Sequence, residues 1–186
     1  MAGSVTLHND KSIAELIALA SSDDLASSGA ACRQLLRRHD ECRQHASQVI
    51  GLLQHGNFAI EDMAFRTVER IGEPASPALL NAMNGATGRF RSYLISLLPI
   101  VADFNTWFPI LTAEFNGPDE AMRFHAANCI GRCYNPGTSW PDDAIATLDR
   151  CIEVLRTCRH SPATNQYWFQ ARMTLRHLGL LDSNTT

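Results

Sequence analysis

The chain has 186 residues, of which 45% are hydrophobic and 19% are charged, and its formal net charge is −3. This length suits one sizeable domain, and the composition excludes wholesale disorder. The weak negative charge does not point to nucleic acid as a partner. Arginine supplies every basic residue except Lys11. This usage is typical of GC-rich bacterial genomes, so we expect a bacterial protein.

Residues 1–20 lack a basic start, and Glu15 interrupts their apolar stretch, so we expect no secretory signal. No run of 18 apolar residues is present, so we expect no membrane span. The six cysteines show neither zinc-finger nor small-disulfide spacing; they are Cys32, Cys42, Cys129, Cys133, Cys151 and Cys158. A reducing compartment suits free thiols. We therefore expect a cytoplasmic protein without a cofactor.

Apolar periodicity predicts a series of helices along the chain. In chain order they cover residues 12–20, 29–38, 40–53, 60–72, 76–83, 90–102, 105–115, 122–134, 142–158 and 167–179. Turn signals separate them, such as Asn135-Pro-Gly137, and no stretch predicts a strand. We expect flexible tails at 1–10 and 182–186 around a single domain at 11–181. The predicted class is all-α.

Four of these helices are related by an internal repeat. The 13-residue segments 60–72, 90–102, 122–134 and 167–179 align without gaps. Their first, ninth and twelfth columns are mostly large and apolar, and the fifth is mostly small. The first, fifth, ninth and twelfth columns are four, four and three residues apart, which keeps them on one stripe of a helix. The segments start 30, 32 and 45 residues apart, which indicates helical hairpins with an insertion before the last.

Two of these stretches carry a family resemblance. VERIGEPASPALLNAM, from Val68 to Met83, resembles the HEAT-like repeat of the phycobilin-lyase type, and MRFHAANCIGRC, from Met122 to Cys133, resembles its second helix. The resemblance implies a right-handed α-α superhelix, a short HEAT-like solenoid of about ten helices. Members of this family share a shape and not an activity.

The resemblance also implies that the second helix of each hairpin lines a concave face. Basic residues outnumber acidic ones on these second helices, and the reverse holds on the first helices. Several rings lie beside arginines, the residue types that dominate binding interfaces. The hypothetical partner-binding set is Arg66, Arg91, Tyr93, Arg123, Phe124, Trp168, Arg172 and Arg176. The competing interpretation is that some rings are core and the arginines are only solvated.

Metal binding and catalysis are two alternatives that the sequence supports less than protein binding. His125, Cys129 and Cys133 share a helical stripe and could ligate a metal, but the two cysteines occupy core columns, so we expect no metal. The acidic pairs at 23–24, 61–62 and 142–143 lie near helix starts, where capping explains them. No phosphate loop, nucleophile elbow or His-Glu-x-x-His motif is present. We expect no catalytic residues.

The sequence therefore predicts a non-enzymatic scaffold, adaptor or inhibitor that binds another protein with an acidic surface and does not enter a membrane. An immunity-protein-like inhibitor is one version. The alternative is a nucleic-acid-binding helical-repeat protein, including a DNA base-excision enzyme. The sequence leaves the partner's identity and the oligomeric state open.

Overall fold

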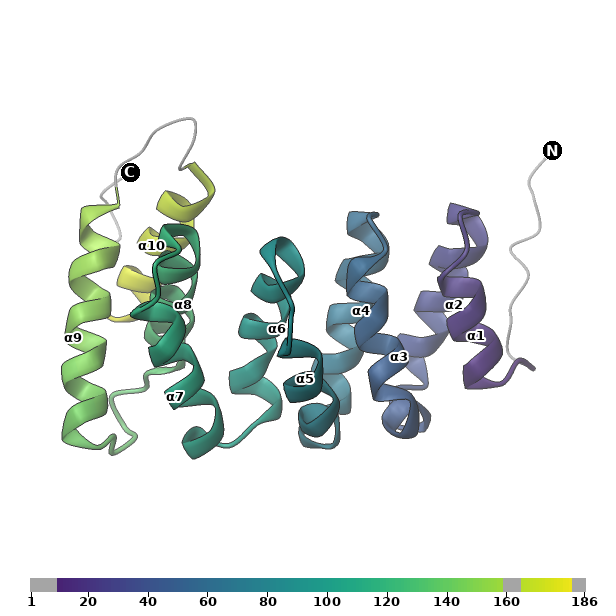
Figure 1. The fold of residues 1–186 in the computed structure, drawn as a ribbon, viewed down its shortest axis with the longest axis horizontal. Coiled ribbons are helices and arrows are strands. Elements are labelled where there is room, and N and C mark those ends of the chain that lie inside the picture. The colour runs from purple at the N-terminus through teal and green to yellow at the C-terminus, as the bar shows by residue number, and fades with distance from the viewer. Residues whose placement is uncertain (1–9, 159–164, 182–186) are drawn as a thin grey trace. The chain divides into compact units, whose positions relative to one another are not determined.

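The computed structural model of the chain describes residues 10–158 and 165–181, the side chains of 165–167 excepted. Within these ranges the regular elements are helices, with no strand among them (Figure 1). The all-α prediction is confirmed. The expected tails lie outside the described residues, apart from Asp10. No helix in the described part of the chain is long and apolar enough to cross a membrane.

The chain divides into two compact units after Ala102. The first contains α1 (Ile13–Ala20), α2 (Leu25–Arg37), α3 (Ala46–Gly51), α4 (Phe58–Ile71), α5 (Ser76–Met83) and α6 (Gly88–Val101). The second contains α7 (Phe104–Phe115), α8 (Glu120–Cys133), α9 (Asp142–Thr157) and α10 (Asn165–His177). Helices α4, α6, α8 and α10 cover most of the four aligned segments.

One expected helix, over residues 40–53, is replaced by three short elements. A 3₁₀ turn at Glu41–His45 precedes α3, and a second turn at Leu52–Gln54 follows it. Arg43 Nη2 pairs with Asp40 Oδ1 at 2.6 Å, and Arg38 Nη2 pairs with Glu41 Oε2 at 2.5 Å. Both pairs are three residues apart, a spacing that eclipses side chains in a 3₁₀ turn with three residues per turn. Residues three apart are also neighbours in an α-helix, so these pairs are compatible with the 3₁₀ turn but do not select it.

The core of the first unit is an apolar layer between successive helices. Helix α1 packs on α2, α2 on α4, and α4 on α6. Leu16, Val68 and Leu94 are completely buried within this layer. Fully burying side chains of this size stabilises the fold by about 1.5–3 kcal/mol each.

The second unit is built around α8, which packs against α7, α9 and α10. Because α8 has neighbours on several sides, its buried residues run around most of the helix, including Ala126, Ala127 and Ile130. The segment between α8 and α9 is anchored by Trp140, whose ring lies 5.3 Å from that of Tyr134 and 5.7 Å from that of Phe108, centroid to centroid. This anchor positions the C-terminal end of α8.

Candidate functional site

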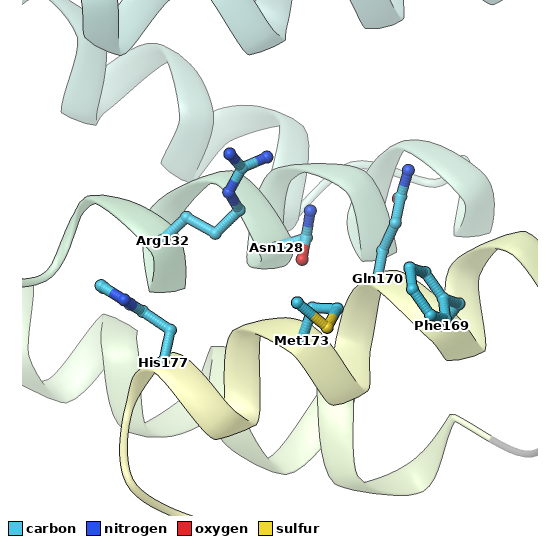
Figure 2. Close-up of a pocket in the computed structure, with 6 residues that line it drawn as sticks. All are labelled: Asn128, Arg132, Phe169, Gln170, Met173 and His177. Carbon is cyan, nitrogen blue, oxygen red and sulfur yellow. The ribbon is translucent and has the colours of Figure 1, made fainter.

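The second unit has a groove between α8 and α10, which we call the α8/α10 groove. Its volume is about 480 Å³. Six side chains line it: Asn128 and Arg132 from α8, and Phe169, Gln170, Met173 and His177 from α10 (Figure 2). In Figure 2 Arg132 and His177 lie toward one end of the groove, and Phe169 and Gln170 lie toward the other.

The two helices meet closely because α8 has a glycine at the contact. A Cβ atom on Gly131 would lie 2.6 Å from Thr174 Cγ2 and 3.7 Å from Leu155 Cδ1. Real Cβ atoms essentially never come as close as 2.6 Å to another atom. The glycine therefore permits the close approach of α10 to α8 at this contact.

A buried polar contact also joins the two helices. The Thr174 hydroxyl donates a hydrogen bond to Asn128 Oδ1, and the two side chains are 0% and 5% exposed. Because the amide oxygen faces Thr174, the amide nitrogen is turned the other way. Figure 2 shows this nitrogen on the side of the groove where the Arg132 guanidinium and the Gln170 amide nitrogen also point. Three nitrogen-bearing groups therefore share one side of the groove.

The apolar part of the groove comes from two large side chains on α10. Phe169 is 61% exposed and Met173 is 48% exposed. They are four residues apart, so they lie next to each other on one helix face. Single exposed apolar residues are ordinary, whereas neighbouring ones rimmed by polar groups mark interaction sites. His177 at the end of the same row is tied to the fold, since its Nε2–H donates to the Tyr134 carbonyl oxygen at 3.1 Å.

The charge around the groove is strongly one-sided. Helix α10 contains no Asp or Glu, and α8 has only Glu120, at its first residue. The arginines on these two helices are Arg123, Arg132, Arg172 and Arg176. Helix α9 has the opposite balance, since its four carboxylates outnumber its two arginines. The α8 and α10 surface of this unit therefore attracts anions.

Five of the predicted binding residues belong to this unit. Phe124 is half-buried and lies one turn before Asn128 on α8, and Arg123 and Arg176 are exposed. The Arg172 guanidinium stacks over the Trp168 ring at 5.1 Å from its centroid. Trp168 and Arg172 each come one residue before a groove-lining residue of α10, Phe169 and Met173, which turns them about 100° around the helix. Neither is among the six side chains that line the groove.

The other three predicted residues belong to the first unit and have intramolecular partners. Arg66 is exposed, and its Nε pairs with Asp62 at 2.9 Å. The half-buried Arg91 donates from Nη1 to the carbonyl oxygens of Met83 and Ala86, at 3.2 and 3.3 Å. Arg91 therefore holds the turn between α5 and α6.

Tyr93, the third of them, belongs to a cluster around Glu61. The Glu61 carboxylate is 3% exposed, and it accepts from the Gly56 N–H, the Tyr93 hydroxyl and the Arg89 guanidinium at 2.9, 2.9 and 2.6 Å. Burial and the contact with this carboxylate raise the pKa of Tyr93 despite the Arg89 charge. Arg89 also stacks over the ring of Phe58, which is 67% exposed. This cluster links the N-terminal ends of α4 and α6.

Of the three residues first considered as metal ligands, Cys129 is buried, whereas His125 and Cys133 are half-buried. Cys129 is 8% exposed, and burial raises the pKa of Cys133 to about 11. A protonated thiol is a poor metal ligand. Among the described side chains, no three His, Cys, Asp or Glu residues gather where they could hold one metal ion.

Sequence reasoning missed most of the groove. It did not select Asn128, Arg132, Gln170, Met173 or His177. One signal was available, because Phe169, Met173 and His177 recur every four residues on the polar side of the fourth repeat. Asn128 gave no such signal, since its role depends on Thr174, which is 46 residues away.

Fold and groove together define an all-α protein with a basic, partly apolar groove between two helices. No family model matches the chain, and no curated protein matches it. The resemblance to HEAT-like repeats therefore stays a prediction.

Proposed function

We propose that this chain is a HEAT-like repeat protein that binds another protein and catalyses no reaction. In this proposal the helices form a short right-handed solenoid, with α4, α6, α8 and α10 as its second helices. The partner presents an acidic surface, and the protein acts in the cytoplasm of a bacterium as an adaptor or an inhibitor. Support for the repeat comes from the aligned segments that these four helices cover.

The observation that carries the proposal is the α8/α10 groove. Phe169 and Met173 leave large apolar surfaces in contact with water, which costs free energy unless a partner covers them. Arg132 rims the same groove and can pair with a carboxylate. Apolar anchors beside an arginine are the composition of interface hot spots.

Four of the six acidic residues considered for catalysis have structural partners, which supports a non-enzymatic role. Asp24 caps α2 by accepting from the Ala26 and Ser27 N–H groups. Asp62 pairs with Arg66, and Glu61 is saturated by three donors. Asp143 Oδ1 accepts from the Ala144 N–H. In these contacts the carboxylates stabilise helix ends and turns.

The test is affinity capture from a lysate of the source organism, read by mass spectrometry. The baits are the wild type, a Phe169→Ala/Met173→Ala variant, and a Leu25→Ala control. Leu25 is a similarly exposed apolar residue, at 55%, in the other unit. We expect one stoichiometric protein that the double variant loses and the control keeps. Arg91→Glu is unsuitable here, because it would break the turn that Arg91 holds.

Nucleic acid is the outcome that would contradict the proposal. Capture of nucleic acid alone, released steeply as salt is raised, would indicate phosphate contacts instead of a protein interface. Equal capture by the wild type and the Phe169→Ala/Met173→Ala variant would remove the groove from the binding surface.

A further inference from the structure

The α8/α10 groove carries enough detail to define the chemistry of its occupant. One side presents the Arg132 guanidinium and the amide nitrogens of Asn128 and Gln170 (Figure 2). All three groups donate hydrogen bonds. The other feature is the apolar pair Phe169 and Met173. An occupant therefore needs an acceptor-rich, anionic group close to an apolar one.

The Asn128 side chain is held in a fixed orientation at the groove. It is 5% exposed, and the buried Thr174 hydroxyl fixes its amide oxygen. The nitrogen is held toward the groove before any ligand arrives, so little ordering entropy is lost on binding. A carboxylate accepts hydrogen bonds from both of its oxygens, which matches a guanidinium beside an amide nitrogen.

The shape favours a helix as the occupant. The lining residues come from two neighbouring helices and follow them, with contributions at positions 128 and 132 and at 169, 173 and 177. A groove of this kind suits an amphipathic helix that lays its apolar face between two others. Residues three or four apart on such a helix lie on one face, so it can present an apolar side chain and a carboxylate together.

We propose that the α8/α10 groove binds an amphipathic acidic helix of the partner protein. An apolar side chain of that helix covers Phe169 and Met173, and a carboxylate three or four residues away pairs with Arg132 and accepts from the Asn128 amide. The one-sided charge of α8 and α10 attracts such a segment and repels a basic one. This inference rests on the proposed protein-binding function and names the partner's chemistry.

A random peptide library tests the proposal without knowledge of the partner. Displayed peptides of about 15 residues, roughly four helical turns, are selected on the full-length wild-type chain. We expect the enriched peptides to share apolar residues at helical spacing with an Asp or Glu three or four positions from one of them. Enrichment of peptides without carboxylates, or no enrichment, would overturn the acidic-helix inference.

The enriched peptide is then labelled and titrated by fluorescence anisotropy. Arg132→Glu should weaken its binding by about tenfold or more, and Met173→Asp should weaken it similarly. Arg70→Glu, at an exposed arginine of the other unit, should leave binding unchanged. Replacing the peptide's carboxylate by lysine should restore binding to Arg132→Glu. Circular dichroism of each variant confirms that it folds.

The outcomes separate this inference from the proposed function. Peptide binding that is weakened by changes at Phe169 and Met173 but unchanged by Arg132→Glu would overturn the carboxylate contact. The proposed protein-binding function would not be affected by that result. A labelled DNA duplex that competes fully with the peptide at physiological salt would overturn the inference in favour of nucleic acid. Binding lost in Arg132→Glu and recovered by the lysine peptide supports it.

Discussion

Gly131 shows how one missing methyl group sets the approach of two helices. Its absent Cβ would lie 2.6 Å from Thr174 Cγ2, inside a packed contact. We expect Gly131→Ala to lower the free energy of unfolding by about 1–3 kcal/mol, because overpacking forces neighbours off their rotamers. Urea denaturation measures the change.

A compensating variant tests the stated cause. Thr174→Ser removes the methyl group that would clash and keeps the hydroxyl that donates to Asn128. Alone it should cost about 1 kcal/mol for the lost buried methyl. Combined with Gly131→Ala it should recover part of the lost stability. If the two effects simply add, the clash is not the cause.

Tyr93 supplies one of the three donors to the buried Glu61 carboxylate. Tyr93→Phe should lower the free energy of unfolding by about 1–2 kcal/mol, because a hydrogen bond to a charged group is lost and the acceptor stays buried. Urea denaturation checks this, and Tyr134→Phe is a matched loss of a hydroxyl elsewhere. Tyr93→Phe should lower the free energy of unfolding less in a Glu61→Gln background than in the wild type. Equal losses in both backgrounds would show that the two groups are not coupled.

Two buried thiols, Cys32 and Cys151, should make the stability of the fold depend on pH. Burial raises the pKa of Cys32 to about 11 and that of Cys151 to about 12. The stability they contribute is complete below the unfolded-state pKa of about 8.5 and is lost as pH rises from there through the folded values. Iodoacetamide at about pH 8 should label both slowly until the protein is unfolded, as read by mass spectrometry. Rapid labelling of the folded protein would show that these thiols are not buried.

At the scale of elements, Trp140 ties the segment between α8 and α9 to α7. Its ring meets those of Phe104, Phe108 and Tyr134 at 5.3, 5.7 and 5.3 Å between centroids. Trp140→Ala should cost about 3–5 kcal/mol, since it leaves a large cavity. Trp140→Phe should cost less because a ring remains. Thermal unfolding followed by circular dichroism compares them, and equal losses would show that the ring contacts contribute little.

At the scale of the whole molecule, the division into two compact units raises the question of whether they unfold together or separately. Gly131→Ala disturbs only contacts within the second unit. In hydrogen exchange, amides of α7–α10 should therefore lose protection, while those of α1–α6 should keep theirs, as expected when local units open separately. A uniform loss across all helices would instead favour the single cooperative domain predicted from sequence.

The sequence determined the class and most helix positions, because helical periodicity is a local property. The segments 76–83 and 142–158 correspond almost residue for residue to α5 and α9. The broken helix at 40–53 escaped prediction, since its apolar pattern is compatible with both helix types.

Only the tertiary structure decided which side chains share a site. Arginines and rings on one helix stripe looked equivalent in sequence, yet Arg91 holds a turn, and neither Trp168 nor Arg172 lines the groove. Asn128 joined the site because Thr174, distant in sequence, turns its amide. The periodicity of a helix fixes which residues share a face. Which face meets another helix, and at what distance, depends on contacts between segments far apart in the chain, such as Gly131 with Thr174.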